Sequence, residues 1–114
     1  MSSLPTVRVR IVFDRHRPIG PGKADLLAAI DRLGSIAAAA RSMEMSYQRA
    51  WSLVDELNRA FRRPLVASSR GGAERGGAAL TKTGRSVLER YRAIERAVSA
   101  SSKSDLRRIA RLAR

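Results

Sequence analysis

Apolar and polar positions follow two different periods along this chain, and the change of period separates the predicted elements. Residues 7–13 carry an apolar side chain at every odd position, with arginine at positions 8 and 10 between them. This period of two is typical of a β-strand with one buried face. A loop rich in proline and glycine follows at 16–22, and from Leu26 onward the apolar residues recur every three or four positions, which indicates helices.

The first predicted helix ends at Leu33. Its apolar stripe consists of Leu26, Leu27, Ile30 and Leu33, and Gly34 follows directly. A glycine at that position is favoured because it adopts the left-handed conformation that ends many helices.

Residues 35–61 predict a short helix, a turn and a longer amphipathic helix. Ser35 is a good N-cap for the alanine-rich segment 36–40, and Ser46 is one for the helix that follows. In that helix Ala50, Val54, Leu57 and Phe61 recur at helical spacing, and we expect Trp51 beside them to lie in the core. This arrangement is typical of a helix-turn-helix.

Residues 64–81 predict a β-hairpin, or wing, with a glycine-rich tip at 71–77. Thr81 is positioned to cap a long helix over 82–98. The apolar stripe of this helix is longer than a domain of this size easily covers. We therefore expect part of it to pair with a second copy of the chain. The expected dimer contacts are Leu88, Tyr91, Ile94 and Val98.

The last twelve residues differ in composition from the rest. In segment 103–114, Leu106, Ile109 and Leu112 alternate with arginines, which fits a basic amphipathic helix or a disordered arm. The predicted organisation is one domain over 1–102 followed by this tail. The fold class is mainly α with a small hairpin: a winged helix-turn-helix with a long C-terminal dimerisation helix.

The charge of the chain narrows its possible partners. Among 114 residues, 23 Lys and Arg stand against 10 Asp and Glu, a net charge of +13. Such an excess favours an anionic partner, and double-stranded DNA is the natural candidate. No apolar run approaches the roughly 20 residues of a membrane span, and no signal peptide is recognisable, so we expect a cytoplasmic, nucleoid-associated protein without membrane contacts.

The same sequence argues against an enzyme. It has no cysteine and one histidine, His16, with no paired acid, triad or metal-spaced cluster around it. We expect no catalytic residues, no metal and no cofactor.

The candidate DNA-reading residues form the first turns of the second helix of the helix-turn-helix. They are Ser46, Tyr47, Gln48, Arg49 and Ser52. Gln48 can pair with adenine and Arg49 with guanine or a phosphate, whereas a solvated polar face is the alternative. Ser46 is chiefly a cap, and Tyr47 either contacts DNA or packs beside Ala50.

Further basic residues flank this helix. Arg70, Arg75 and Lys82 lie on or next to the wing, where glycines allow close approach to the sugar-phosphate chain; a mobile, solvated hairpin is the alternative. Arg41 either contacts a phosphate or pairs with Glu44. The two arginines of segment 7–13 we interpret as solubilising.

Four sequence segments together resemble the N-terminal DNA-binding domain of the molybdate-responsive regulators of the ModE type. They are Gly34-Ser35-Ile36, Met45-Ser46-Tyr47 followed by Ala50-Trp51, Glu56-Leu57-Asn58, and Gly76-Gly77-Ala78 before Leu80-Thr81 and Gly84. The resemblance spans roughly residues 7–97, and the helix-turn-helix also resembles that of LysR-type regulators. It implies a winged-helix homodimer that binds palindromic operators near molybdate-transport or molybdenum-enzyme genes.

The chain departs from this family pattern at three places. It has Gln48 where Lys or Arg is usual, and Ala73-Glu74-Arg75 at a tip that is otherwise nearly all glycine. We therefore expect a different operator sequence. Beyond residue 114 there is no C-terminal molybdate-binding module in this sequence, so we do not expect direct molybdate binding.

Two other functions compete with a homodimeric regulator. One is an interaction module that heterodimerises with a full-length related regulator. The other is an architectural, nonspecific DNA binder in which the arginine-rich tail carries most of the affinity.

Overall fold

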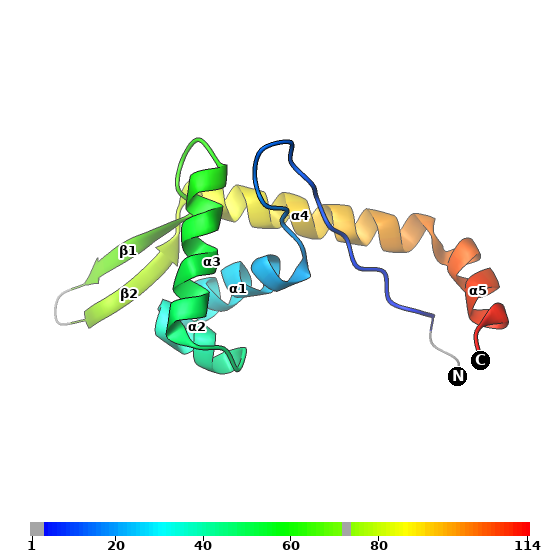
Figure 1. The fold of residues 1–114 in the computed structure, drawn as a ribbon, viewed down its shortest axis with the longest axis horizontal. Coiled ribbons are helices and arrows are strands. Elements are labelled where there is room, and N and C mark those ends of the chain that lie inside the picture. Colours follow the sequence, from blue (N-terminus) through cyan, green and yellow to red (C-terminus); the bar gives the residue numbers. More distant parts are fainter. Residues whose placement is uncertain (1–3, 72–73) are drawn as a thin grey trace.

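The computed structural model describes residues 4–71 and 74–114, and the side chains of 69–75 lie outside this description. Within those residues, five helices accompany one two-stranded antiparallel sheet (Figure 1). The elements are α1 (Pro21–Leu33), α2 (Ile36–Ser42), α3 (Tyr47–Ala60), β1 (Val66–Gly71), β2 (Glu74–Leu80), α4 (Lys82–Ser101) and α5 (Lys103–Leu112). The predicted winged helix-turn-helix, mainly α with a small hairpin, is confirmed.

Local capping interactions set the helix boundaries where the sequence predicts them. Gly34 has φ 79°, and its N–H donates to the Ile30 carbonyl at 2.8 Å, which ends α1. The hydroxyl oxygens of Ser35, Ser46 and Thr81 accept hydrogen bonds from the backbone N–H three residues later, at 3.0, 3.1 and 2.9 Å. Each satisfies a donor that the first turn of a helix otherwise leaves unpaired.

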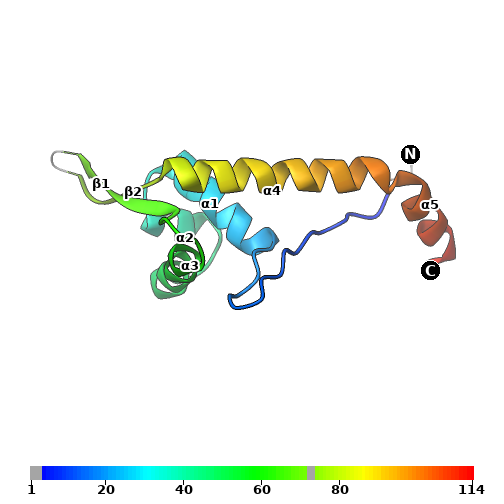
Figure 2. The same cartoon turned by 90° about the horizontal axis from the view of Figure 1, so that it is seen from above.

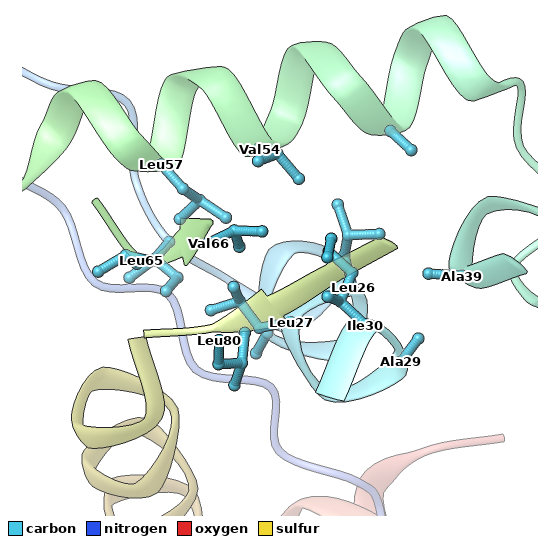
Figure 3. Packing of buried hydrophobic residues seen from close by; sticks show 14 of the residues in the cluster. Leu26, Leu27, Ala29, Ile30, Ala39, Val54, Leu57, Leu65, Val66 and Leu80 are labelled. Carbon is cyan, nitrogen blue, oxygen red and sulfur yellow. The ribbon is translucent and has the colours of Figure 1, made fainter. Parts of the chain in front are cut away.

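The core lies where α1, α3 and the base of the wing meet (Figure 3). Leu26, Leu27 and Ile30 of α1 are fully buried, and the stripe of α3 formed by Val54 and Leu57 packs over them with the wing residues. Leu33, which the sequence places on the same stripe, is 41% exposed. Figure 2 shows α1 lying between α4 on one side and α3 on the other, so α3 occupies an outer face of the molecule.

The strands of the wing extend beyond the apolar segments of the sequence and into the glycine-rich tip. Its strands pair in register from Val66 opposite Leu80 to Ser69 opposite Gly77, and the pairing becomes irregular beyond Ser69. The wing is also joined to the helix-turn-helix, since the Ala78 N–H donates to the Gly34 carbonyl at 2.9 Å. The turn before α2 therefore helps to fix the direction of the hairpin.

The predicted strand over 7–13 is wrong. Its alternation of half-buried odd positions with exposed even ones is present through residue 13, but its regular pairing is limited to one isolated bridge between Ile11 and Ile19. A strand needs a neighbour along its length, and here the segment runs in extended form against α4 instead. The Tyr91 hydroxyl donates to the Val9 carbonyl at 2.6 Å and fastens it there.

The C-terminal part of the described chain is helical. Helix α4 continues to Ser101, three residues past the predicted end, and projects beyond the core (Figures 1 and 2). The tail forms α5, which agrees with the amphipathic-helix alternative and not with a disordered arm. Among the described residues, none of these helices is both long and apolar enough to span a bilayer.

Candidate nucleic-acid interface

The N-terminal turns of α3 stand open to solvent. Ser46, Tyr47, Gln48, Arg49 and Ser52 are all exposed, and they lie together on the outer side of the helix. The side-chain oxygen of Ser46 accepts the hydrogen bond of the cap, which leaves its hydroxyl proton, and the side chains of the other four residues, available for contacts. The structure thus brings together the five residues that the sequence singles out on this helix.

Among the charged residues of α3, Arg49 has no ion-pair partner within the part of the chain that is described. Asp55 pairs with Arg59 at 3.0 Å, and Glu56 pairs with Lys23 at 3.0 Å. No ion pair among the described residues involves Arg49. Because both carboxylates of the helix are matched, the N-terminal turns present a net positive charge at a helix end that already favours anions.

The flanking basic residues are placed on four other elements. Arg41 is exposed at the end of α2, and the alternative pair with Glu44 is not formed between these described side chains. Lys82 is exposed at the first position of α4. The backbones of Arg70 and Arg75 belong to β1 and β2, but their side chains lie outside the described part.

The expected core position of Trp51 is wrong. Its side chain is 51% exposed, and that of Tyr47, one helical turn earlier, is 55% exposed. Both residues lie at the edge of the buried stripe formed by Ala50, Val54 and Leu57, on the flank of α3 that faces the wing. Whether an edge position is covered depends on the neighbouring element, and here the hairpin leaves a hollow instead of closing over the indole.

Asn58 joins α3 to the wing, a role that sequence reasoning missed. Its Oδ1 accepts from the N–H groups of Leu65 and Val66 at 2.8 and 3.1 Å, and its Nδ2 donates to the Val66 carbonyl at 3.1 Å. The side-chain amide thus makes the same pair of hydrogen bonds with Val66 that the backbone of a neighbouring strand would make, at the base of the hairpin. The motif Glu56-Leu57-Asn58 marks Asn58 in the sequence, but it does not show that Asn58 binds the backbone of residues 65 and 66.

The base of the hairpin is also held from the side of α4. The Thr81 hydroxyl donates to the Pro64 carbonyl at 2.6 Å, and a Cβ added to Gly84 would lie 2.0 Å from the Leu65 carbonyl oxygen. Only a glycine permits this approach of α4 to the chain entering β1. Helix α3, the wing and α4 therefore meet at residues 64–66.

The four predicted dimer contacts separate into two groups. Tyr91 is 1% exposed within the single chain, where its hydroxyl donates to the Val9 carbonyl, so its side chain offers almost no surface to a second copy. Leu88 is half-buried against the core, Val98 is half-buried, and Ile94 is 40% exposed. Burial, and secondly the charge of nearby Glu95, raise the pKa of Tyr91.

Arg92 fixes the neighbouring surface of α4. Its guanidinium contacts Asp25 of α1 and Glu95 of its own helix, each at 2.9 Å. Hydrogen bonds to Asp25 and then to Glu95 raise the pKa of Arg92 above its ordinary value. This pairing ties α4 to α1 on the side opposite α3.

Comparison with known proteins places this architecture in a family. The model of the bacterial regulatory helix-turn-helix proteins of the lysR family matches residues 23–85, which cover α1 to the start of α4. The chain belongs to the LysR family of these regulatory proteins. Besides the helix-turn-helix, the match includes most of α1, the wing with its contacts at residues 64–66, and the first turn of α4.

Several relatives of this LysR-family chain carry names connected with molybdenum. It is 43% identical over 81 residues to the molybdenum-pterin-binding protein MopB of Rhodobacter capsulatus, covering 71% of this chain and 30% of that protein. It is 44% identical over 88 residues to the molybdenum transport protein ModE of Azotobacter vinelandii, covering 77% and 33%. The transcriptional regulator ModE of Haemophilus influenzae is 37% identical over 78 residues, covering 68% and 31%. The chain thus spans about a third of these relatives, and the resemblance to the ModE type is confirmed.

Solved structures agree with this LysR-family fold. The DNA-binding domain of CbnR, crystallised with DNA, superimposes with a TM-score of 0.59 and 25% identity, covering 78% of this chain and 94% of that one. A MarR-family protein of Mycobacterium tuberculosis, in complex with p-aminosalicylic acid, has a TM-score of 0.53 at 22% identity, covering 82% and 75%. The second likeness concerns the fold alone.

Proposed function

We propose that this LysR-family chain is the DNA-binding part of a ModE-type transcriptional regulator. It binds a palindromic operator as a homodimer, at genes of molybdate transport or molybdenum enzymes, and acts on the bacterial nucleoid in the cytoplasm. The observation that carries the proposal is the exposed first turn of α3, in which Arg49 has no ion-pair partner among the described residues while both carboxylates of the helix are paired. The choice of target genes rests on the names of the relatives.

In this proposal α3 enters the major groove by its N-terminal end. Gln48 pairs with adenine and Arg49 with guanine, each good bidentate contact adding about 1–3 kcal/mol of discrimination. Arg41, Lys82 and the wing contact phosphates, which position the domain without reading sequence. The connections of the wing to Asn58 and Gly34 support a fixed spacing between the two elements.

Dimerisation is proposed to use α4 and α5. Ile94 on α4 is 40% exposed, and Ile109 and Leu112 on α5 are 58% and 86% exposed. Large apolar side chains left open on a projecting pair of helices are suited to a second copy, and a two-fold dimer matches a palindromic site.

The test compares two arginine variants. Arg49→Ala should weaken binding to a palindromic fragment from upstream of molybdate-transport genes by about 1–3 kcal/mol, with dimerisation unchanged. Arg90→Ala removes the same charge from an exposed position on α4 and serves as the matched control. Fluorescence anisotropy gives the affinities and sedimentation gives the mass; wild-type affinity in Arg49→Ala contradicts the assignment of α3.

A second candidate function is architectural, nonspecific DNA binding through α5. It is favoured by the exposed Arg107, Arg108 and Arg111 on that helix. Replacement of Arg107, Arg108 and Arg111 by glutamine, which leaves Ile109 and Leu112 in place for the dimer, separates the two candidates. The loss of all DNA binding supports the architectural function, whereas a modest loss with sequence preference retained supports the regulator.

A further inference from the structure

A hollow lies between α3 and the wing, next to the proposed DNA-reading turn. It encloses about 190 Å³ and is bounded on the helical side by Ile36, Tyr47, Trp51, Val54 and Asn58. Segments 66–68 and 76–78 of the hairpin form the other side. Among the described residues that line it, none is an Asp or a Glu, so nothing there repels a phosphate chain.

Two aromatic side chains are the largest apolar groups in the lining of this hollow. Tyr47 and Trp51 are four residues apart, which places them one above the other on the same side of α3. Each leaves half of its surface bare, at 55% and 51% exposure. Single exposed apolar residues are common on protein surfaces and need no explanation. Two large aromatic side chains exposed together on one flank of a helix are unusual, and they indicate a binding surface.

We propose that Tyr47 and Trp51 form a seat for one sugar-phosphate strand of DNA in the hollow between α3 and the wing. The inference rests on the proposed function. When a helix enters the major groove and a hairpin approaches the adjacent minor groove, the strand that separates the two grooves passes between them. The deoxyribose carbons pack on the aromatic faces, and the Tyr47 hydroxyl and the Trp51 indole N–H donate to phosphate oxygens.

The charge of the surroundings supports a DNA strand over a peptide as the occupant. Tyr47 and Trp51, which line the hollow, also border the open surface at the start of α3 that includes Arg49, and the whole sequence carries a net charge of +13. The hollow itself offers two aromatic rings among neutral polar groups, which suit a DNA backbone whose sequence is not being read. Trp51 therefore contributes affinity and not base discrimination.

A spectroscopic test uses the protein without any substitution, because Trp51 is the single tryptophan of the sequence. Saturation with a 24-base-pair duplex should lower the acrylamide quenching constant of its fluorescence by about twofold or more, as DNA covers the exposed indole. The anisotropy of the same duplex, labelled with fluorescein, reports saturation independently. An unchanged quenching constant at full saturation overturns the inference.

Variants supply the second test. Trp51→Ala should weaken binding about tenfold to the palindromic and the scrambled duplex alike, whereas Trp51→Phe retains most of the affinity because it keeps a flat apolar ring. Val12→Ala, at a residue that is 72% exposed on the N-terminal segment, is the matched control and should have no effect. Thermal unfolding of each variant verifies the fold.

The outcomes distinguish this inference from the function on which it rests. Absence of duplex binding by the wild type refutes the proposed function itself. Duplex binding with Trp51 unprotected, or with full affinity in Trp51→Ala, refutes only the seat. Protection of Trp51 that rises with protein concentration in the absence of DNA shows a second copy as the occupant and likewise refutes it.

Discussion

The side chain of Asn58 hydrogen-bonds both backbone groups of Val66, accepting from its N–H and donating to its carbonyl, each at 3.1 Å. Asn58 is in the last turns of α3, and Val66 begins β1. This side-chain amide therefore helps to fix the angle between the proposed DNA-reading helix and the wing. Because both elements must reach DNA together in the proposed complex, this contact links stability to binding.

Replacement of Asn58 by alanine should lower the free energy of unfolding by about 2–4 kcal/mol. The change leaves the N–H groups of Leu65 and Val66 without their partner, and both residues are buried. Urea denaturation measures the loss. The neighbouring Arg59→Ala is the control, since its side chain is 79% exposed in a surface ion pair with Asp55 and should cost less than about 1 kcal/mol. Equal losses in the two variants would refute the role assigned to Asn58.

Substitution of Gly84 by alanine should destabilise the chain by about 3 kcal/mol. The new Cβ would lie 2.0 Å from the Leu65 carbonyl oxygen, and backbone must move to relieve the overlap. Gly22→Ala, also in a helix, meets no atom within 4 Å and should cause no loss, or a gain of up to about 1 kcal/mol from helix propensity. Denaturant midpoints of the two variants provide the comparison; a tolerated alanine at position 84 would contradict the close packing of α4 on the wing.

Tyr91→Phe should lower the free energy of unfolding by about 1 kcal/mol, because it removes the hydrogen bond to the Val9 carbonyl. The advantage of tyrosine depends on pH. Burial, followed by the charge of Glu95, raises the pKa of Tyr91, so the unfolded chain loses this proton first as the pH rises above about 10. The wild type should therefore exceed the variant in stability below pH 10 and lose that margin above it. A margin that is constant, or that grows, between pH 9 and 11 would contradict the hydrogen bond.

Local sequence signals predict the helix ends of this chain well. Ser35, Ser46, Thr81 and Gly34 each act within three or four residues of their own position, so their partners are fixed by helix geometry. The exposed residues of the α3 N-terminus follow from the same periodicity. These features need no knowledge of distant segments.

The errors concern contacts between distant segments. The alternation in 7–13 shows that one face is covered but not what covers it, and α4 takes the place of a partner strand. For the same reason the apolar stripe of α4 predicts burial of Tyr91 without showing that the chain's own N-terminal segment provides it. Trp51 lies at the edge of a stripe, where the position of the wing decides its exposure.

Fluorescence anisotropy across a salt series distinguishes sequence-specific from nonspecific DNA binding by this LysR-family chain. A palindromic fragment from upstream of molybdate-transport genes is compared with a scrambled duplex of equal length. If the chain is a sequence-specific regulator, its affinity for the palindrome should exceed that for the scrambled duplex by about a thousandfold or more, and this preference should persist at physiological salt. Equal affinities for the two duplexes, falling together as salt rises, would contradict it and indicate binding by charge alone.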